Sequence, residues 1–109
     1  MAKKAPIRVI VINPKNETIT EQTVTPTFQE YYKIMECEII EAARPPLAGG
    51  HFLWVDENGW AKPAHELHTF IMKGYQSSLV GTAIMVRGTA GQAECNLTLD
   101  YVKSIVKFT

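Results

Sequence analysis

Neither sign of charge is in excess in this sequence, because eleven basic residues balance eleven acidic ones. Domains that bind nucleic acids draw much of their affinity from Lys and Arg side chains that neutralise phosphates, so they usually carry a basic surface. Here basic residues gather only near the amino end, at Lys3, Lys4 and Arg8. Between a DNA-binding arm and a polar tail, the charge balance favours a flexible tail over residues 1–6. We therefore expect no nucleic-acid partner.

Long hydrophobic runs are also absent. No unbroken apolar run is longer than that from Val9 to Ile12, which is far too short to span a membrane. The amino end lacks the apolar segment of a signal peptide, because Arg8 interrupts the stretch that follows Lys3 and Lys4. These absences predict a cytoplasmic protein with no membrane partner.

Cysteine is too scarce for a disulfide framework, since Cys37 and Cys95 are the two cysteines of the chain and lie far apart. In a reducing compartment we expect both thiols to be free and partly buried. The remaining composition, with 46% hydrophobic and 20% charged residues in 109, is ordinary for a globular protein. It predicts a single domain over residues 1–109.

The first part of the chain predicts a hairpin and then a helix. Residues 7–12 are β-branched and almost wholly apolar, which is typical of a strand buried on both faces. After a turn, the Thr-rich residues 17–24 return as a strand with one face in water. Thr25 is the expected N-cap and Pro26 the first helical residue. The apolar face of this helix consists of Phe28, Tyr31, Tyr32 and Met35.

That aromatic stripe is expected to pack against the sheet, with a stacking platform for bases as the alternative. A third strand is predicted over residues 37–42. The prolines and glycines of residues 44–50 predict an irregular loop. A strand follows at 51–55, and Asp56-Glu57-Asn58-Gly59 predicts a tight hairpin from which Trp60 begins the return strand.

The last part of the chain predicts a short helix over 63–73, an apolar strand over 80–87 and a closing helix over 98–108. Local hairpins combined with helices indicate an α+β fold. We expect a single, mainly antiparallel sheet with the helices packed on one face.

Several motifs resemble a domain family of unknown function that is frequent in bacteriophages and mobile elements. They are the opening Ile7-Arg8-Val9-Ile10-Val11-Ile12-Asn13-Pro14, the 56–59 turn followed by Pro63, the segment 81–88 and the closing 97–102. His65 departs from the family pattern, in which Asn is expected, so no role of that amide is carried over. The resemblance implies a phage or mobile-element origin, and it implies no known reaction.

No recognisable catalytic or metal-binding motif is present. His65 and His68 are three residues apart, whereas the zinc-protease motif needs a spacing of four with a Glu as base. His51 and the cysteines could complete a metal site, but we expect no metal and no cofactor. No elbow motif or oxyanion-forming turn flanks either cysteine, and Glu36, Glu38 and Glu41 fit an exposed face. We expect no catalytic residue.

Flat rings and guanidinium groups are concentrated around the glycine-proline loop and the segment after it. Such groups bind nucleotide-like ligands through stacking and bidentate phosphate contacts. The alternative is that Trp54 and Trp60 form a cross-strand pair while the arginines are solvated. The predicted ligand-binding residues are Arg44, Trp54, Trp60, His65, His68 and Arg87, with Tyr75 nearby.

Two functions remain open at this point. One is a non-catalytic protein that sequesters a small nucleotide-derived ligand and so blunts a bacterial defence signal, acting as a homo-oligomer. The other is a protein-interaction module that occupies a host protein by its surface or by an edge strand. A ligand binder is stabilised by its ligand through mass action, whereas an interaction module co-purifies with a host protein.

Overall fold

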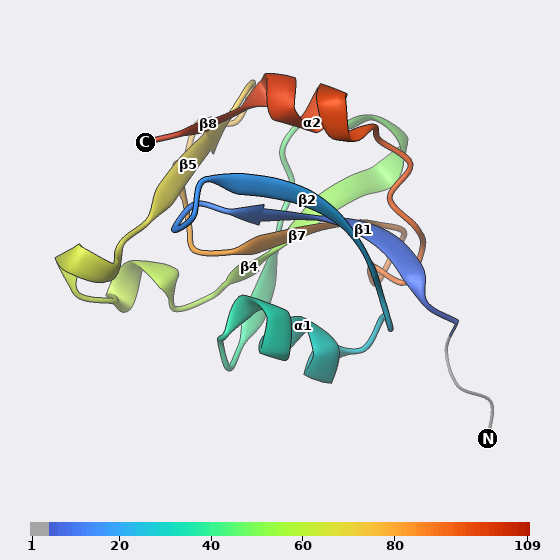
Figure 1. Cartoon of the computed structure of the whole chain (residues 1–109), viewed down its shortest axis with the longest axis horizontal. Coiled ribbons are helices and arrows are strands. Elements are labelled where there is room, and N and C mark those ends of the chain that lie inside the picture. The colour runs from blue at the N-terminus through green and yellow to red at the C-terminus, as the bar shows by residue number, and fades with distance from the viewer. Residues whose placement is uncertain (1–4) are drawn as a thin grey trace.

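The computed structural model describes residues 5–109, so most of the tail expected over residues 1–6 lies outside the described residues. Within this range eight strands form two antiparallel sheets (Figure 1). The larger sheet has the order β2-β1-β7-β4-β3, and the smaller has the order β6-β5-β8. The larger sheet contains β1 (Ile7–Asn13), β2 (Thr18–Val24), β3 (Ile40–Ala43), β4 (His51–Asp56) and β7 (Ala83–Arg87). The smaller contains β5 (Thr69–Met72), β6 (Leu79–Val80) and β8 (Val106–Phe108).

Strand β1 confirms the expectation of a strand buried on both faces. It pairs with β2 along its whole length, from Ile7 opposite Val24 to Asn13 opposite Thr18, and with β7 on its other side. Its apolar side chains are divided between two separate cores, with Val9 in one and Ile10 in the other. The predicted opening hairpin is therefore confirmed, and β1 lies inside the sheet.

The prediction of a mainly antiparallel α+β fold is confirmed, but the prediction of a single sheet is wrong, because a second sheet is present. The two helices lie on opposite faces of the larger sheet, so the prediction that the helices share one face is also wrong. Helix α1 (Phe28–Met35) places Tyr31 and Met35 in one core. Helix α2 (Leu99–Ile105) places Val102 in the other core, which the smaller sheet also covers. Figure 1 shows α1 and α2 on either side of the β1–β7–β4 layer. Because β1 and β7 are apolar on both faces, both faces need cover from water.

Helix α1 begins later than predicted. Thr27, not Thr25, is the N-cap, and its Oγ1 accepts the N–H of Glu30. Pro26 therefore precedes the helix. The apolar stripe is also split, because Tyr31 is buried whereas Phe28 is 49% exposed. Strand β3 is displaced as well and runs over Ile40–Ala43, not over residues 37–42.

The predicted hairpin after β4 does not form. Asn58 has a φ of −100°, and the next residues, Gly59–Ala61, make a turn of 3-10 helix. Trp60 lies on this turn, is 62% exposed and begins no strand. Strand β4 instead pairs with β3 and β7, which places Trp54 opposite Ala42 and Ile84. The alternative of a Trp54–Trp60 cross-strand pair is therefore wrong.

The segments predicted over 63–73, 80–87 and 98–108 are each divided. Residues Ala64–Glu66 form a 3-10 turn and then β5 follows, so the predicted helix is wrong. Gly81, with a φ of +82°, separates β6 from β7. Helix α2 ends at Ile105, and the last predicted turn is instead β8, which pairs with β5.

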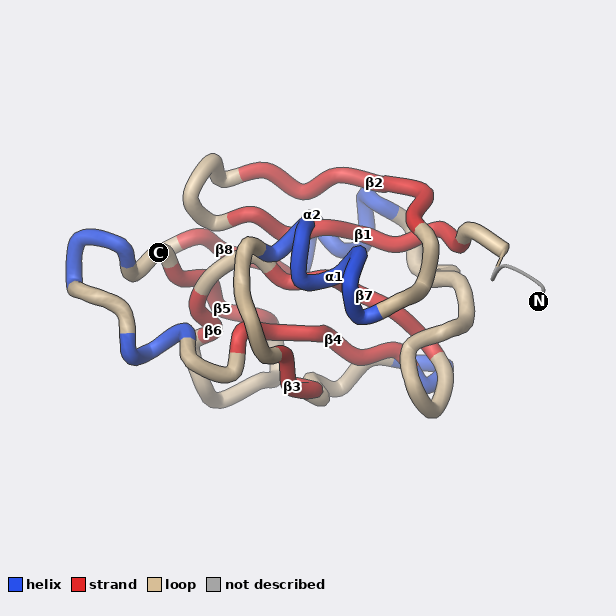
Figure 2. Tube along the Cα trace, turned by 90° about the horizontal axis from the view of Figure 1, so that it is seen from below, coloured by secondary structure: helices blue, strands red, loops and turns tan. Residues whose placement is uncertain are grey.

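No helix within residues 5–109 has the length and apolarity that crossing a membrane requires. Figure 2 shows β2 at one margin of the larger sheet and β3 at the other. Cys37 is half-buried, Cys95 is buried, and neither forms a disulfide. These positions agree with the expectation of free, partly buried thiols.

Candidate functional site

An open groove lies at the amino end of α1. Its volume is about 660 Å³. Three segments far apart in the sequence form its walls: the start of β1, the first turn of α1 with the residues before it, and the loop after β7. The lining residues are Ala5, Ile7, Pro26, Thr27, Phe28, Gln29, Tyr31, Ala90 and Gln92. The volume falls within the range of ligand-binding pockets in proteins.

The groove offers a ring and a few polar groups. Phe28 lines it with a half-exposed ring. The first-turn N–H groups of Phe28 and Gln29 have no acceptor within the helix, because the first amides of any helix lack one. Gln29 and Gln92 carry side-chain amides. None of the described lining residues carries a charge. The groove therefore suits a flat, uncharged ring better than a free phosphate.

Phe28 also connects the groove to an aromatic cluster on the α1 side of the sheet. Its ring meets the Trp54 indole edge-on, with centroids 5.8 Å apart, and stacks with Tyr32 at 6.3 Å. Trp54 meets Phe52 edge-on at 5.0 Å. At the far end of this cluster, the Arg44 guanidinium lies 4.7 Å from the centroid of the Phe52 ring. Such ring contacts hold Phe28 in a defined orientation.

The loop that forms one wall of the groove is fixed by buried contacts. The Tyr31 hydroxyl donates to the carbonyl of Gly91 at 2.9 Å. Gly91 has a φ of +69°, and a Cβ added there would lie 2.6 Å from Nε1 of Trp54. No acceptor for that buried indole N–H is present among residues 5–109. The close approach of backbone to indole explains why this position is glycine.

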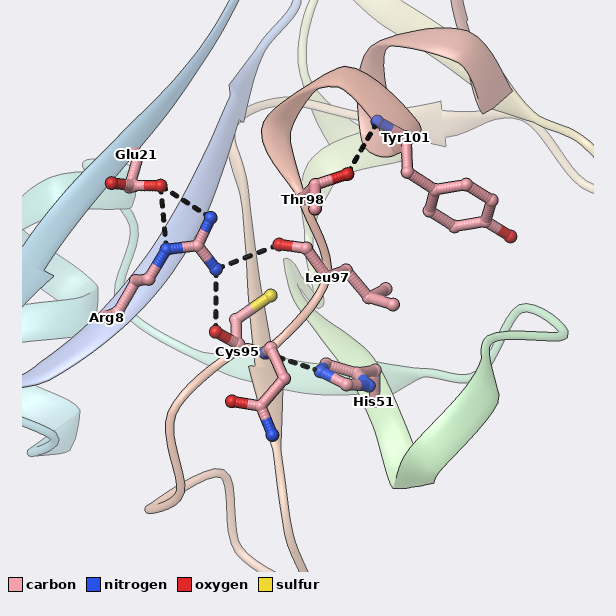
Figure 3. Close-up of polar contacts among 8 residues, drawn as sticks. Arg8, Glu21, His51, Cys95, Leu97, Thr98 and Tyr101 are labelled. Atoms are coloured by element: carbon pink, nitrogen blue, oxygen red, sulfur yellow. Dashed lines mark hydrogen bonds and ion pairs between the residues drawn. The ribbon is translucent and has the colours of Figure 1, made fainter.

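Two side chains from the larger sheet hold the chain that follows this loop (Figure 3). From β1, Arg8 donates to the carbonyls of Cys95 and Leu97 at 2.7 and 2.9 Å, and its Nε donates to Glu21. From β4, the buried His51 accepts the N–H of Asn96 on Nε2 at 2.9 Å. The ring proton of His51 therefore sits on Nδ1, which donates to the carbonyl of Ala48. The groove wall is preorganised by these contacts.

Of the predicted ligand-binding residues, the structure brings Arg44 and Trp54 to the same face of the sheet, with Phe52 between them. Arg87 lies on the opposite face. Side chains alternate along a strand, and its neighbour Val86 belongs to the core under α1. The Arg87 Nε also donates to the carbonyl of Glu94 at 2.8 Å. A single ligand contacting both arginines, as predicted, does not fit this arrangement.

The other predicted residues lie away from the groove. Trp60 and His65 are exposed on the two 3-10 turns after β4. His68 is half-buried and lines a smaller polar cleft of about 230 Å³ near the carboxyl end of α1, together with Lys15, Glu36 and Lys62. Tyr75 packs against the core on the α2 side. The residues predicted to form one ligand-binding site therefore lie in at least three separate places.

Within residues 5–109, no group of three or more His, Cys, Asp or Glu side chains is placed so that it could hold a metal ion. Burial raises the pKa of the Cys95 thiol above its usual range, and burial together with Asp56 raises that of Cys37. Both thiols are therefore held in the protonated form, whereas a nucleophilic cysteine needs a lowered pKa.

Sequence reasoning missed the residues that form the groove. Phe28 was assigned to a core-facing stripe, and Gln29, Ala90 and Gln92 drew no attention. Phe28 is the first residue of α1, and its ring is half exposed. The exposure of Phe28 agrees with the alternative that this aromatic stripe forms a stacking platform for bases. The meeting of residues 5–7, 26–31 and 90–92 is a tertiary feature with no local signal.

No curated protein and no solved structure shows a significant match to the chain. A family profile, described as a domain of unknown function (DUF3846), matches residues 7–108. That range includes every strand and helix described above and all of the groove except Ala5. The chain belongs to the DUF3846 family.

Proposed function

We propose that this protein is a non-catalytic binding protein that sequesters a small nucleotide-derived molecule, with the base held in the groove at the amino end of α1. The observation that carries the proposal is the half-exposed Phe28 ring in a preorganised groove of about 660 Å³. Aromatic side chains stack on bases of any sequence, because every base has a π-face.

The charge distribution determines how the ligand lies. The described lining residues are uncharged, so the base and not a phosphate occupies the groove. The first-turn N–H groups of Phe28 and Gln29 are available to donate hydrogen bonds to the edge of the base. Arg44 and Trp54 remain in the proposal, since they share the α1 face with Phe28. Arg87 leaves it, because it lies on the other face.

The biological role is inferred from the sequence motifs that resemble a domain family expected in bacteriophages and mobile elements. We propose that sequestration in the cytoplasm of a host bacterium lowers the concentration of a signalling nucleotide and so blunts a defence response. A protein in this role needs affinity and abundance but no turnover. The raised pKa values of the Cys37 and Cys95 thiols fit such a role.

Calorimetric titration tests the groove. The wild-type protein is titrated with a panel of adenosine, ADP-ribose derivatives and cyclic dinucleotides, and the binding member is then titrated into Phe28→Ala. Because stacking on an aromatic ring contributes about 1–3 kcal/mol, we expect the affinity to fall roughly tenfold or more. Trp60→Ala, which removes another exposed ring, is the matched control and leaves the affinity unchanged.

Two results would argue against this function. Equal affinities of wild type and Phe28→Ala would remove the groove from the site. Failure of every panel member to bind, or to raise the melting temperature of the wild type, would favour a second candidate, the protein-interaction module. That second function is supported by the exposed edge of β2, and co-purification with a host protein would identify it.

A further inference from the structure

Strand β2 is the one long unpaired edge among the strands of residues 5–109. It has seven residues and no strand on its outer side. The opposite edge, β3, has four residues and is followed by Pro45 and Pro46, which cannot extend strand pairing. In the smaller sheet, the edge strands β6 and β8 have two and three residues. Short edges and prolines are common protections against unwanted strand pairing.

Strand β2 carries none of those protections. Its sequence, Thr-Ile-Thr-Glu-Gln-Thr-Val, contains no proline and no lysine. The pairing with β1 runs residue for residue without a bulge that would twist the edge away. Threonine, isoleucine and valine also favour extended backbone. The outer edge of β2 therefore offers backbone N–H and C=O groups to another strand.

The side chains of β2 are also unusually exposed to solvent. In a strand that covers a core with one face, every second residue is buried. In β2 the four residues from Thr20 to Thr23 are all exposed. The strand's single charged side chain, Glu21, already receives hydrogen bonds from Arg8, which is a residue of the same sheet. An approaching strand thus meets no unpaired charge on this edge.

We propose that β2 pairs antiparallel with β2 of a second copy of this chain, which joins two five-stranded sheets into one continuous sheet across a two-fold axis. Two identical strands match in length and twist, and a two-fold contact closes on itself without further growth. The register centred on Thr20 places Thr20 opposite Thr20 and Thr18 opposite Gln22. It brings polar pairs together on the face of Thr20, and it places each Glu21 opposite an Ile19, so the two Glu21 carboxylates do not face each other.

Charge complementation tests this contact. When two sheets join across a two-fold axis, the side chains of Thr20 and Gln22 from both copies lie on one common face. In a register centred on residue 20, 21 or 22, at least one of these two positions therefore lies opposite Thr20 or Gln22 of the other copy. One variant combines Thr20→Lys with Gln22→Lys, and the other combines Thr20→Glu with Gln22→Glu. Both positions are exposed, and the Gln22 side-chain amide donates to the Thr20 hydroxyl.

Sedimentation velocity from low to high micromolar concentration is the readout. We expect a wild-type dimer, monomers for each double variant alone, and a dimer again in their equimolar mixture. The control variant combines Gln76→Lys with Ser77→Lys in the exposed loop after β5, adds the same charge and keeps the dimer. Recovery in the mixture also shows that both variants are folded.

Three results would overturn the proposal. If the wild type stays monomeric at every concentration, β2 does not pair with a second copy, and its edge is free to pair with a strand of another protein. A dimer that survives in both double variants uses a different surface. A mixture that stays monomeric shows that the two β2 strands do not face each other. None of these outcomes depends on ligand binding in the groove, because the titration with Phe28→Ala measures that separately.

Discussion

At the scale of single residues, Tyr31 joins α1 to the loop that forms one wall of the groove. Its ring is 1% exposed, and its hydroxyl donates to the Gly91 carbonyl. Burial raises the pKa of this phenol from 10.0 to about 12. Because the folded state holds the proton more tightly than the unfolded state, the stability contribution is complete below pH 10 and is lost as the pH rises towards 12.

We predict that the free energy of unfolding falls by roughly 2 kcal/mol between pH 10 and pH 12 on account of Tyr31 alone. Urea denaturation at a series of pH values measures this loss. Tyr31→Phe is the control, because it lacks the titrating hydroxyl while retaining the ring. At neutral pH it loses about 1 kcal/mol with its hydrogen bond, and it shows a shallower alkaline decline. Parallel declines in both proteins would contradict the assignment.

Gly91 is the residue whose missing side chain matters most to the groove wall. Both Gly91 and Gly50 have a positive φ, of +69° and +77°, so an alanine strains the backbone at either position. A Cβ at Gly91 also approaches Trp54 and Val86 within 3 Å, whereas a Cβ at Gly50 meets open space. We predict that Gly91→Ala costs roughly 1–3 kcal/mol more than Gly50→Ala, as measured by denaturant unfolding. Equal losses would mean that the loop shifts freely.

At the scale of elements, the segment between β7 and α2 has little regular structure and depends on side chains from elsewhere. Arg8 supplies two hydrogen bonds to its carbonyls and a third to Glu21. Lysine has the charge but not the planar fork that reaches three acceptors. We predict that Arg8→Lys lowers the stability by about 1–2 kcal/mol and speeds hydrogen exchange in residues 93–98.

Arg44→Lys is the matched control for that exchange. It makes the same substitution at an exposed arginine whose guanidinium lies over the Phe52 ring. It should leave the exchange of residues 93–98 unchanged. Protection that is equally strong in Arg8→Lys and wild type would show that the backbone bond from Cys95 to Arg8 suffices to hold the segment.

The elements also show why some predictions succeeded. The opening hairpin was predictable, because the apolar residues 7–12 and the Thr-rich residues 17–24 have different patterns and adjoin in sequence. The 3-10 turn and the strand β5, which stand in place of the helix expected over 63–73, were not predictable. Leu67, Phe70 and Ile71 fit helical spacing, yet Phe70 is buried and Ile71 is 39% exposed, as in a strand. The pairing of β5 with β6 and β8 decided between the two patterns, and no local signal reveals those partners.

At the scale of the whole molecule, the larger sheet separates two cores. The unbroken apolar runs of β1 and β7 indicated burial on both faces, which is incompatible with helices on one face alone. The structure agrees with the burial on both faces that these apolar runs indicated, and not with the expectation of helices on one face. The candidate site was less predictable: Trp54 and Arg44 were named, but the groove depends on how three distant segments meet. Charge and ring type suggest a ligand, whereas only the tertiary structure determines where it fits.

We predict that truncating the central strands is severe. Val9 on β1 and Ile84 on β7 are both fully buried in the core beneath α1. Val9→Ala and Ile84→Ala should each lower the free energy of unfolding by about 2–4 kcal/mol, since each leaves a cavity between sheet and helix. Thr20→Ala on the exposed edge strand should cost less than about 1 kcal/mol. Thermal and urea denaturation measure these losses. Losses below about 1 kcal/mol at both Val9 and Ile84 would contradict the central position of the two strands.

The position of β7 in the sheet has a consequence for the timing of folding. This strand lies between β1 and β4, yet it comes from the last quarter of the chain. During synthesis the β1–β2 hairpin can form early, while the inner side of β1 stays unpaired until residues 83–87 have left the ribosome. Closing loops of this length slows folding relative to a fold of local contacts. The nascent chain therefore passes through a period in which an almost wholly apolar strand is open to chaperones and to aggregation.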